Sequence, residues 1–68
     1  MKLKNRLRIL RAEKEISQKD LAEEVDLSRQ TVNSIERGKF NPSIVTALKI
    51  AGFFEVPVEE VFKLEKED

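Results

Sequence analysis

Polar side chains with hydrogen-bonding groups cluster between residues 28 and 34, at the start of a short amphipathic segment. Their guanidinium, amide and hydroxyl groups are those that bind base edges and phosphate oxygens of duplex DNA. A generic surface helix is also polar on its outer side, but mainly through Glu and Lys. The cluster therefore predicts a DNA-contacting surface, with a plain pair of antiparallel helices as the alternative. Its members are Ser28, Arg29, Gln30, Thr31, Asn33 and Ser34.

Two amphipathic segments, joined by a tight break, place this cluster within a predicted helix-turn-helix at about residues 18–37. Their apolar residues are spaced as in two helices that cross and share a core. Ala22 has a small side chain at the position where the two helices are expected to approach closely. Ser28 suits the N-cap of the second helix, and Gly38 follows that helix where a left-handed residue is favoured. The shared apolar residues are Leu21, Val25, Leu27, Val32 and Ile35.

The same helical periodicity extends to both sides of this unit. A helix is expected at about residues 5–14, and Ser17 with Asp20 suits the capping box of the helix after it. A fourth helix follows Pro42 and Ser43, and a short fifth helix begins near Pro57. The expected inward residues are Ile44, Ala47, Leu48 and Ala51 in the fourth helix and Val58, Val61 and Phe62 in the fifth.

The two ends of the chain alternate apolar and polar residues, at residues 1–4 and 62–66. This alternation predicts two short strands that pair antiparallel, and frayed charged ends are the alternative. The predicted fold class is therefore all-α, with five helices in one domain over residues 1–68 and a possible two-stranded ribbon formed by the termini.

Composition excludes several functions. The chain of 68 residues has no Cys and no His, which excludes disulfides, Cys/His metal sites and His-based catalysis. Without a convergent pair of carboxylates, we expect no enzyme, no metal and no cofactor. The longest apolar run is far too short to span a membrane, so a soluble intracellular protein is the expectation. The net charge is zero, but residues 1–49 carry +4 and residues 50–68 carry −4, so a basic surface is available locally.

The residues around the predicted helix-turn-helix resemble the lambda and 434 repressor and Cro family, also called Xre-type. The resemblance rests on residues 16–22 (Ile-Ser-Gln-Lys-Asp-Leu-Ala), residues 28–38 (Ser-Arg-Gln-Thr-Val-Asn-Ser-Ile-Glu-Arg-Gly) and residues 41–43 (Asn-Pro-Ser). It implies a five-helix repressor-like fold and a transcriptional regulator, mainly a repressor, that binds a palindromic operator as a homodimer. It also implies a prokaryotic cytoplasmic protein located at its operator. An antitoxin-like or coactivator-like protein-binding module is the alternative, through the acidic segment 55–68.

The resemblance also implies roles for individual residues. Arg11 and Glu36 match a pair that forms a salt bridge between helices, and a solvated surface arginine is the alternative for Arg11. The base-contacting positions are Arg29, Gln30, Asn33 and Ser34. The positions that contact or orient phosphates are Ser17, Gln18, Ser28, Thr31, Arg37, Lys39, Asn41 and Ser43.

The chain departs from the family pattern at two places. Asp26 stands in the turn where Gly is common, and residues 52–55 replace the usual end of the fourth helix. Two adjacent Phe residues are hard to bury together in a small protein, so an apolar partner surface is expected at about residues 52–66. The predicted dimer interface consists of Phe53, Phe54, Val56, Val58, Phe62 and Leu64.

Overall fold

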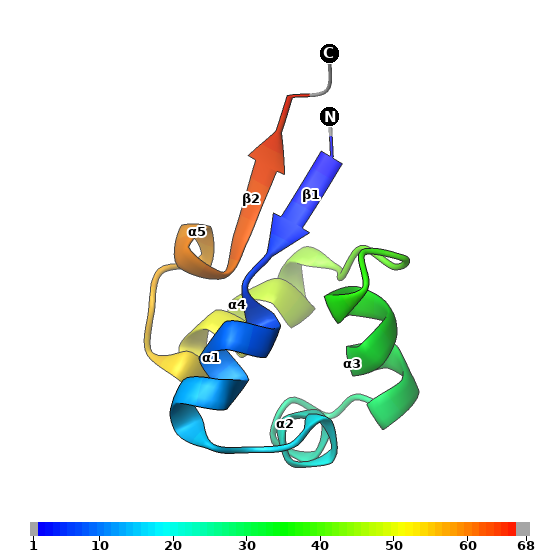
Figure 1. The fold of residues 1–68 in the computed structure, drawn as a ribbon, viewed down its shortest axis with the longest axis vertical. Helices are drawn as coiled ribbons and strands as arrows, with labels where there is room; N and C mark the ends of the chain where they lie inside the picture. The colour runs from blue at the N-terminus through cyan, green and yellow to red at the C-terminus, as the bar shows by residue number, and fades with distance from the viewer. Residues whose placement is uncertain (1, 67–68) are drawn as a thin grey trace.

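The computed structural model describes residues 2–66, which form five helices and a two-stranded ribbon (Figure 1). The helices gather at one end of the long axis, and the ribbon projects from the other end. The elements in chain order are β1 (Lys2–Asn5), α1 (Leu7–Lys14), α2 (Gln18–Glu24), α3 (Arg29–Glu36), α4 (Ile44–Phe54), α5 (Val58–Val61) and β2 (Phe62–Glu65). This is the mostly α-helical architecture that the sequence predicts. No helix among the described residues is long and apolar enough to cross a bilayer.

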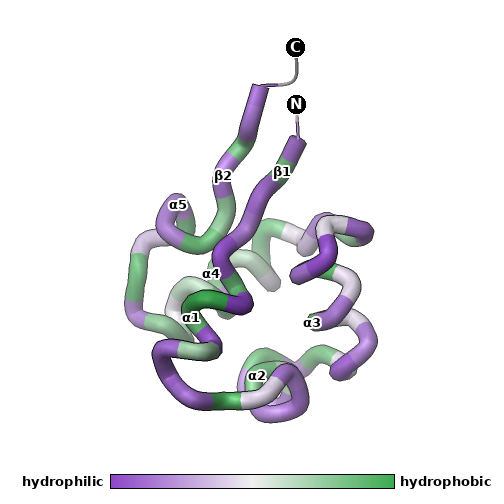
Figure 2. Tube along the Cα trace, viewed as in Figure 1, coloured by the Kyte–Doolittle hydropathy of each residue, from purple (hydrophilic) through white to green (hydrophobic). Residues whose placement is uncertain are grey.

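One apolar core draws on all five helices and the first residue of β2. Hydrophobic positions occur in each helix, whereas the ribbon is mostly hydrophilic (Figure 2). The buried residues are Leu7, Leu10, Leu21, Ala22, Val25, Val32, Ile35, Ile50, Ala51, Phe54, Val61 and Phe62. Most of these positions are the apolar ones that helical periodicity singles out, because that spacing places them on one face of each helix.

Side-chain caps start the helices of the predicted helix-turn-helix where expected. Ser17 Oγ accepts a hydrogen bond from the Asp20 N–H at 3.0 Å, and Asp20 Oδ2 accepts one from the Ser17 N–H at 3.1 Å. Ser28 Oγ accepts one from the Thr31 N–H at 3.0 Å. Gly38 takes the left-handed conformation, with φ of 73°, one residue beyond the C-cap of α3. These caps satisfy N–H and C=O groups that a helix cannot pair internally.

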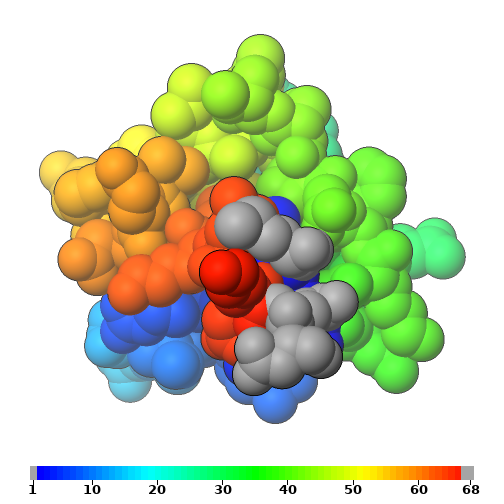
Figure 3. Space-filling view, turned by 90° about the horizontal axis from the view of Figure 1, so that it is seen from above, coloured from blue at the N-terminus to red at the C-terminus, as the bar shows by residue number. Residues whose placement is uncertain are grey.

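Residues 2–5 and 62–65 form the predicted antiparallel ribbon, and Met1, also expected in the first strand, lies outside the described residues. β1 pairs with β2 in the register Lys2↔Glu65, Leu3↔Leu64, Lys4↔Lys63 and Asn5↔Phe62. The first helix begins at Leu7 rather than near residue 5, because residues 2–5 belong to β1. Seen along the ribbon, β2 lies at the centre and the green atoms of α3 lie to one side (Figure 3).

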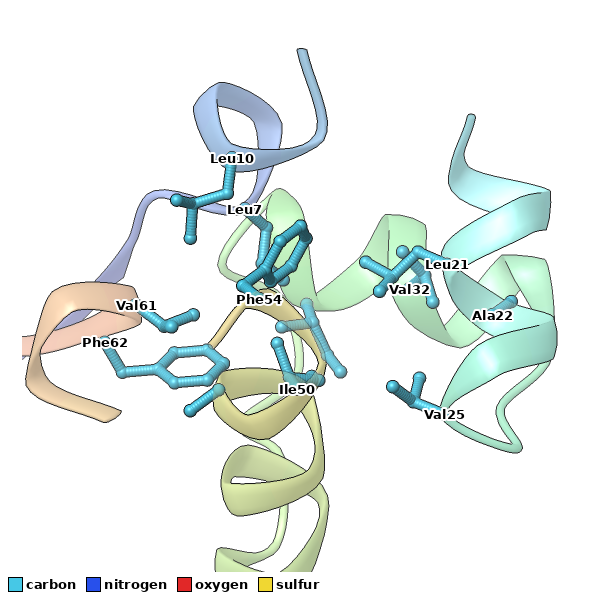
Figure 4. Packing of buried hydrophobic residues seen from close by; sticks show 12 residues of the cluster. Leu7, Leu10, Leu21, Ala22, Val25, Val32, Ile50, Phe54, Val61 and Phe62 are labelled. Atoms are coloured by element: carbon cyan, nitrogen blue, oxygen red, sulfur yellow. The ribbon is translucent and has the colours of Figure 1, made fainter. Parts of the chain in front are cut away.

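The inward stripe predicted for α4 is wrong at two of its four positions. Ile44 and Leu48 are 77% and 55% exposed, whereas Ile50, Ala51 and Phe54 are buried. The core therefore contacts mainly the C-terminal half of α4, next to α5 and Phe62 (Figure 4). Only Thr46, Lys49 and Gly52 interrupt the apolar residues of α4, so the sequence offers two overlapping stripes at helical spacing.

The expected partner surface near the C-terminus lies largely inside the protein. Phe54 and Phe62 are buried, and Phe53, Val56 and Val58 are partly buried against the core. Phe53 packs edge-on against Phe54, with ring centroids 5.0 Å apart, and Lys14 Nζ lies 5.3 Å from the Phe53 ring centroid. Successive helical residues point about 100° apart, so Phe54 enters the core while Phe53 covers its edge. Of the six residues predicted there, Leu64 alone is mostly exposed, at 67%.

Candidate nucleic-acid interface

The two helices α2 and α3 lie against each other at the edge of the molecule (Figure 1). Val32 and Ile35 of α3 are buried, which turns Arg29, Gln30, Asn33 and Ser34 of that helix outward. The turn between the helices depends on Asp26, which takes the left-handed conformation with φ of 58°. An Asp tolerates this region better than most residues. The Leu27 N–H then donates to the Ala22 carbonyl at 2.9 Å, which closes the turn.

The four predicted base-contacting residues share the outward face of α3. Arg29 and Gln30 are exposed, and Asn33 and Ser34 are half-buried at the next turn of the helix. Within residues 2–66, the side chains of Arg29 and Gln30 make no hydrogen bond or ion pair with the protein. They are therefore free to bind a ligand from the solvent side.

A shallow surface depression of about 350 Å³ lies beside this face. Gln30, Thr31 and Ser34 line it from α3, and Lys39 and Phe40 line it from the loop that follows. The depression brings together residues predicted to contact bases with residues predicted to contact phosphates. Sequence reasoning missed Phe40, since an isolated Phe in a loop carries no periodicity.

Gln18 connects α2 to α3 through its side-chain amide. Its Nε2 donates to Asn33 Oδ1 and to Glu36 Oε1, each at 3.2 Å. The contact uses the oxygen of the Asn33 amide and leaves its NH₂ group available to donate elsewhere. Gln18 thus positions a predicted base-contacting side chain from the neighbouring helix.

Glu36 is the centre of a polar network that joins α1, α2 and α3. Its two carboxylate oxygens accept hydrogen bonds from Arg11 Nε at 2.5 Å and Nη2 at 2.9 Å, in addition to the one from Gln18. Arg11 Nη1 also donates to the Ile16 carbonyl at 3.1 Å, just before α2. The expected pair of Arg11 and Glu36 is thus present, and it fixes the C-terminal end of α3 against α1.

The charge on Glu36 is maintained in spite of its burial. Burial is the largest single influence and acts to raise the pKa of Glu36. Hydrogen bonds from Arg11 and Gln18, with the positive charges of Arg11 and Arg8, outweigh it and hold the pKa below the usual value of 4.5. The hydrogen bond to Glu36 raises the pKa of Arg11, against the opposing effect of burial. Glu36 is therefore ionised at neutral pH, and Arg11 neutralises the one acid of α3.

The residues predicted to contact phosphates divide into two groups. Ser17, Ser28 and Ser43 each cap a helix, so their hydroxyl oxygens already accept a backbone N–H. The Ser28 hydroxyl also shares a 2.8 Å hydrogen bond with that of Thr31. The other residues predicted there, apart from half-buried Gln18 and Thr31, are exposed at and beyond the end of α3: Arg37, Lys39 and Asn41.

The structure adds residues of β1 to the surroundings of α3. Asn5 Nδ2 donates to the Ile35 carbonyl at 2.9 Å, and Asn5 Oδ1 accepts from the Leu7 N–H at 3.1 Å. Lys2 and Lys4 line a second depression, of about 200 Å³, together with Arg37. Because these contacts span some 30 residues of chain, no local pattern marks Asn5 as a neighbour of α3.

Comparisons with known proteins agree with this geometry. A family model described as helix-turn-helix matches residues 7–61. An HTH-type transcriptional regulator of Methanocaldococcus jannaschii is 44% identical over 66 residues, covering 97% of this chain and 100% of the relative. An immunity repressor of Bacillus phage phi105 is 34% identical over 61 residues, covering 90% of this chain and 42% of the repressor.

Two solved structures are also similar. A protein from Bacteroides fragilis superimposes with a TM-score of 0.80 at 26% identity, covering 90% of this chain and 98% of that one. The restriction-modification controller protein C.AhdI from Aeromonas hydrophila has a TM-score of 0.73 at 41% identity, covering 79% and 78% of the two chains.

Proposed function

This chain belongs to the helix-turn-helix family of DNA-binding transcriptional regulators, and from that premise we propose that it is a repressor that binds a palindromic operator as a homodimer. One observation carries the proposal: the outward face of α3 presents the unpaired side chains of Arg29 and Gln30, and a part-buried polar network holds Asn33 and the helix behind them. The Asn33 side chain, which Gln18 already orients, loses little conformational freedom on binding, and this favours specific recognition.

In the proposed complex, α3 enters the major groove and its N-terminal half meets the base edges. Arg29 donates two hydrogen bonds to O6 and N7 of a guanine, which is the commonest specific contact of arginine with DNA. Gln30 contacts an adenine or a thymine methyl group, and Asn33 and Ser34 make lesser contacts. The Asn33 side chain is already oriented by Gln18, so its free NH₂ group is available to a base acceptor.

Phosphate contacts set the position of α3 along the duplex without reading its sequence. Gln18, Arg37 and Lys39 supply the main ones, and Asn41 and the capped N-termini after Ser17, Ser28 and Ser43 add further donors. A helix N-terminus presents unpaired N–H groups and a partial positive charge, both of which favour a phosphate oxygen. The exposed Arg37 and Lys39 lie at the start of the loop after α3, where the backbone of the DNA would pass.

A homodimer supplies the specificity that one helix lacks. A single recognition helix reads only a few base pairs, and two copies about 34 Å apart read two half-sites on one face of the duplex. Repression follows when the bound dimer occupies a promoter. The similarity to a phage immunity repressor supports this direction of control.

Selection of bound sequences from a random duplex pool tests the proposal. We expect an enriched palindrome whose half-sites are separated by one helical turn, and an affinity that falls steeply between low and physiological salt. Enrichment of a single asymmetric site would contradict the homodimer, and an affinity that does not change with salt would contradict phosphate contacts. A reporter gene placed behind the selected site then separates repression from activation.

A further inference from the structure

The ribbon carries exposed lysines where it meets the end of α3. Successive residues of a strand point to opposite faces. Leu3 packs against the core, and Asn5 donates to the Ile35 carbonyl, so these two residues mark the inner face of β1. The side chains of Lys2 and Lys4 therefore share the outer face, and both are exposed.

A depression of about 200 Å³ joins this part of β1 to the C-terminal end of α3. Three cationic side chains line it: Lys2, Lys4 and Arg37. Gly38 lines it as well, and a Cβ added there would have no atom within 4 Å, so the depression is open at the turn that ends α3. β1 is the strand of the ribbon nearer to α3 (Figure 1). A ligand that lies along the end of α3 can therefore reach the two lysines.

The depression is positively charged because its one acid is already neutralised. Glu36 also lines it, but that side chain is only 2% exposed and its carboxylate accepts hydrogen bonds from Arg11 and Gln18. The Arg37 side chain makes no hydrogen bond or ion pair with residues 2–66. An anion that enters the depression thus meets ammonium and guanidinium groups and no free carboxylate among the residues that line it.

The partner of Lys4 within the protein is one that it can exchange. Lys4 Nζ lies 3.1 Å from Glu65 Oε2, with side chains 56% and 55% exposed. An ion pair this exposed contributes little stability. Lys4 also lies directly opposite Lys63 in the ribbon, and like charges at such positions weaken a strand pair. The stability of the ribbon therefore does not account for the lysine at position 4.

We propose that Lys2 and Lys4 of β1, together with Arg37, bind phosphate groups of the operator, so that the ribbon adds backbone contacts to those of α3 and its loop. The inference rests on the proposed function. Arg37 links the two sets, because it is the C-cap residue of α3 and also lines the depression beside β1. Lysine binds phosphate as a point charge. Contacts of this kind add affinity and carry no base preference.

The salt dependence of DNA binding measures this contact. Each neutralised phosphate contributes about 0.9 to the slope of log affinity against log salt concentration, so Lys2→Ala with Lys4→Ala should lower the slope by about one to two. The double variant should weaken binding to the selected operator and to a scrambled duplex by the same factor. Lys2→Arg with Lys4→Arg keeps both charges and should recover the wild-type slope. Fluorescence anisotropy over a range of salt concentrations gives these quantities.

Lys63→Ala with Lys66→Ala is the matched control. It removes the same charge from β2 and the residue after it, neither of which lines the depression beside α3. We expect its slope to equal that of the wild type, and circular dichroism with urea unfolding establishes that each variant remains folded. A wild-type slope in Lys2→Ala with Lys4→Ala would overturn the proposal. An equal decrease in the two double variants would do the same, because it would report net charge and not a site.

Ethylation interference locates the contact independently. Ethylation of a phosphate removes its charge, so it weakens binding only where the protein needs that phosphate. The wild type should be sensitive at phosphates where Lys2→Ala with Lys4→Ala is insensitive, and the control variant should match the wild type. Identical interference patterns for all three proteins would contradict the ribbon contact.

The scrambled duplex separates this inference from the proposed function, because phosphate contacts do not depend on base sequence. A wild type without sequence preference, whose slope Lys2→Ala with Lys4→Ala still lowers, would contradict the repressor and support the ribbon contact. A sequence-specific wild type whose slope the double variant leaves unaltered would refute the ribbon contact and leave the repressor standing. A wild type that binds no duplex would contradict both.

Discussion

Arg11 and Glu36 face each other between α1 and α3, and one edge of the guanidinium binds both oxygens of the carboxylate. The Glu36 side chain is only 2% exposed and that of Arg11 is 15% exposed. The pair lies directly behind the face predicted to contact DNA, since Glu36 also accepts a hydrogen bond from Gln18, which holds Asn33. A structural ion pair and a predicted base contact are therefore parts of one network.

Breaking this pair from one side should destabilise the protein strongly. Arg11→Met leaves a buried carboxylate without its main partner, which costs about 3–5 kcal/mol, a large part of the stability of a small domain. The double variant Arg11→Met with Glu36→Leu should recover much of the loss, because no buried charge remains. Urea unfolding of the four proteins gives the coupling energy.

The exposed pair of Arg6 and Glu60 provides the control for that cycle. Its atoms are 3.3 Å apart, with side chains 45% and 58% exposed. We expect a coupling of no more than about 1 kcal/mol there. Equal coupling in the two pairs would show that burial does not strengthen the interaction of Arg11 with Glu36.

The stability of the protein should decrease in acid through Glu36. Because folding lowers the pKa of Glu36, the folded state binds its proton more weakly than the unfolded state does. The stability that ionised Glu36 contributes is fully present above the pKa of the unfolded state, near 4.5. It is lost as the pH falls from there through the lower pKa of the folded state. Urea midpoints measured from neutral pH downward should show this loss in the wild type and a smaller one in Arg11→Met. A wild-type acid dependence that Glu36→Gln leaves unaltered would refute the assignment.

Arg29 and Lys39 should have different effects on DNA binding. Arg29→Ala should cost about 1–3 kcal/mol on the selected operator and relax the preference at one base position. Lys39→Ala should weaken binding to all sequences alike. It should also reduce the slope of log affinity against log salt concentration by about the amount that one phosphate contact contributes. Fluorescence anisotropy with the operator and a scrambled duplex, over a range of salt, distinguishes the two. If Arg29→Ala preserves the base preference, Arg29 is not the residue that reads a base.

Gln18 should act on specificity through Asn33. Gln18→Ala removes the hydrogen bonds to Asn33 and Glu36, so we expect about tenfold weaker operator binding and a lower preference at the base that Asn33 contacts. Lys19→Ala, on the same helix but without these bonds, is the matched control. A variant Gln18→Ala that binds all duplexes equally weakly, with its base preference intact, would assign Gln18 to phosphate binding alone.

Asn5 should stabilise α3 from the ribbon. Asn5→Ala leaves the Leu7 N–H without its acceptor and removes one donor from the Ile35 carbonyl, which keeps the Gly38 N–H, at a cost of about 1–3 kcal/mol. Asn5→Asp should be worse, because a carboxylate oxygen would then face the Ile35 carbonyl. Lys4→Ala, which removes an exposed 3.1 Å pair with Glu65, should change the unfolding midpoint little. Equal midpoints for Asn5→Ala and the wild type would show that the contact is not needed.

The sequence by itself determined the parts of this protein that depend on neighbouring residues. The caps at Ser17 and Ser28 and the left-handed Gly38 follow from groups within three residues of each helix end, and the structure has them where expected. The outward polar face of α3 follows equally, since burial of Val32 and Ile35 places Arg29 and Gln30 on the opposite, exposed side of the helix. The ribbon could also be predicted, because apolar and polar residues alternate at both ends of the chain. Each of the two short strands predicted there has the other as a partner of matching length.

Only the tertiary structure decided which faces the apolar segments bury. Since α4 is apolar on almost all sides, its periodicity permits more than one inward stripe, and packing against α5 and the rest of the core selected Ile50, Ala51 and Phe54. The same packing drew Phe54 and Phe62 inward and left Ile44 and Leu48 exposed, the reverse of what the sequence predicts for these four residues. Asn5 joined α3 for a similar reason: its partner is 30 residues away, and only the folded chain brings the two together.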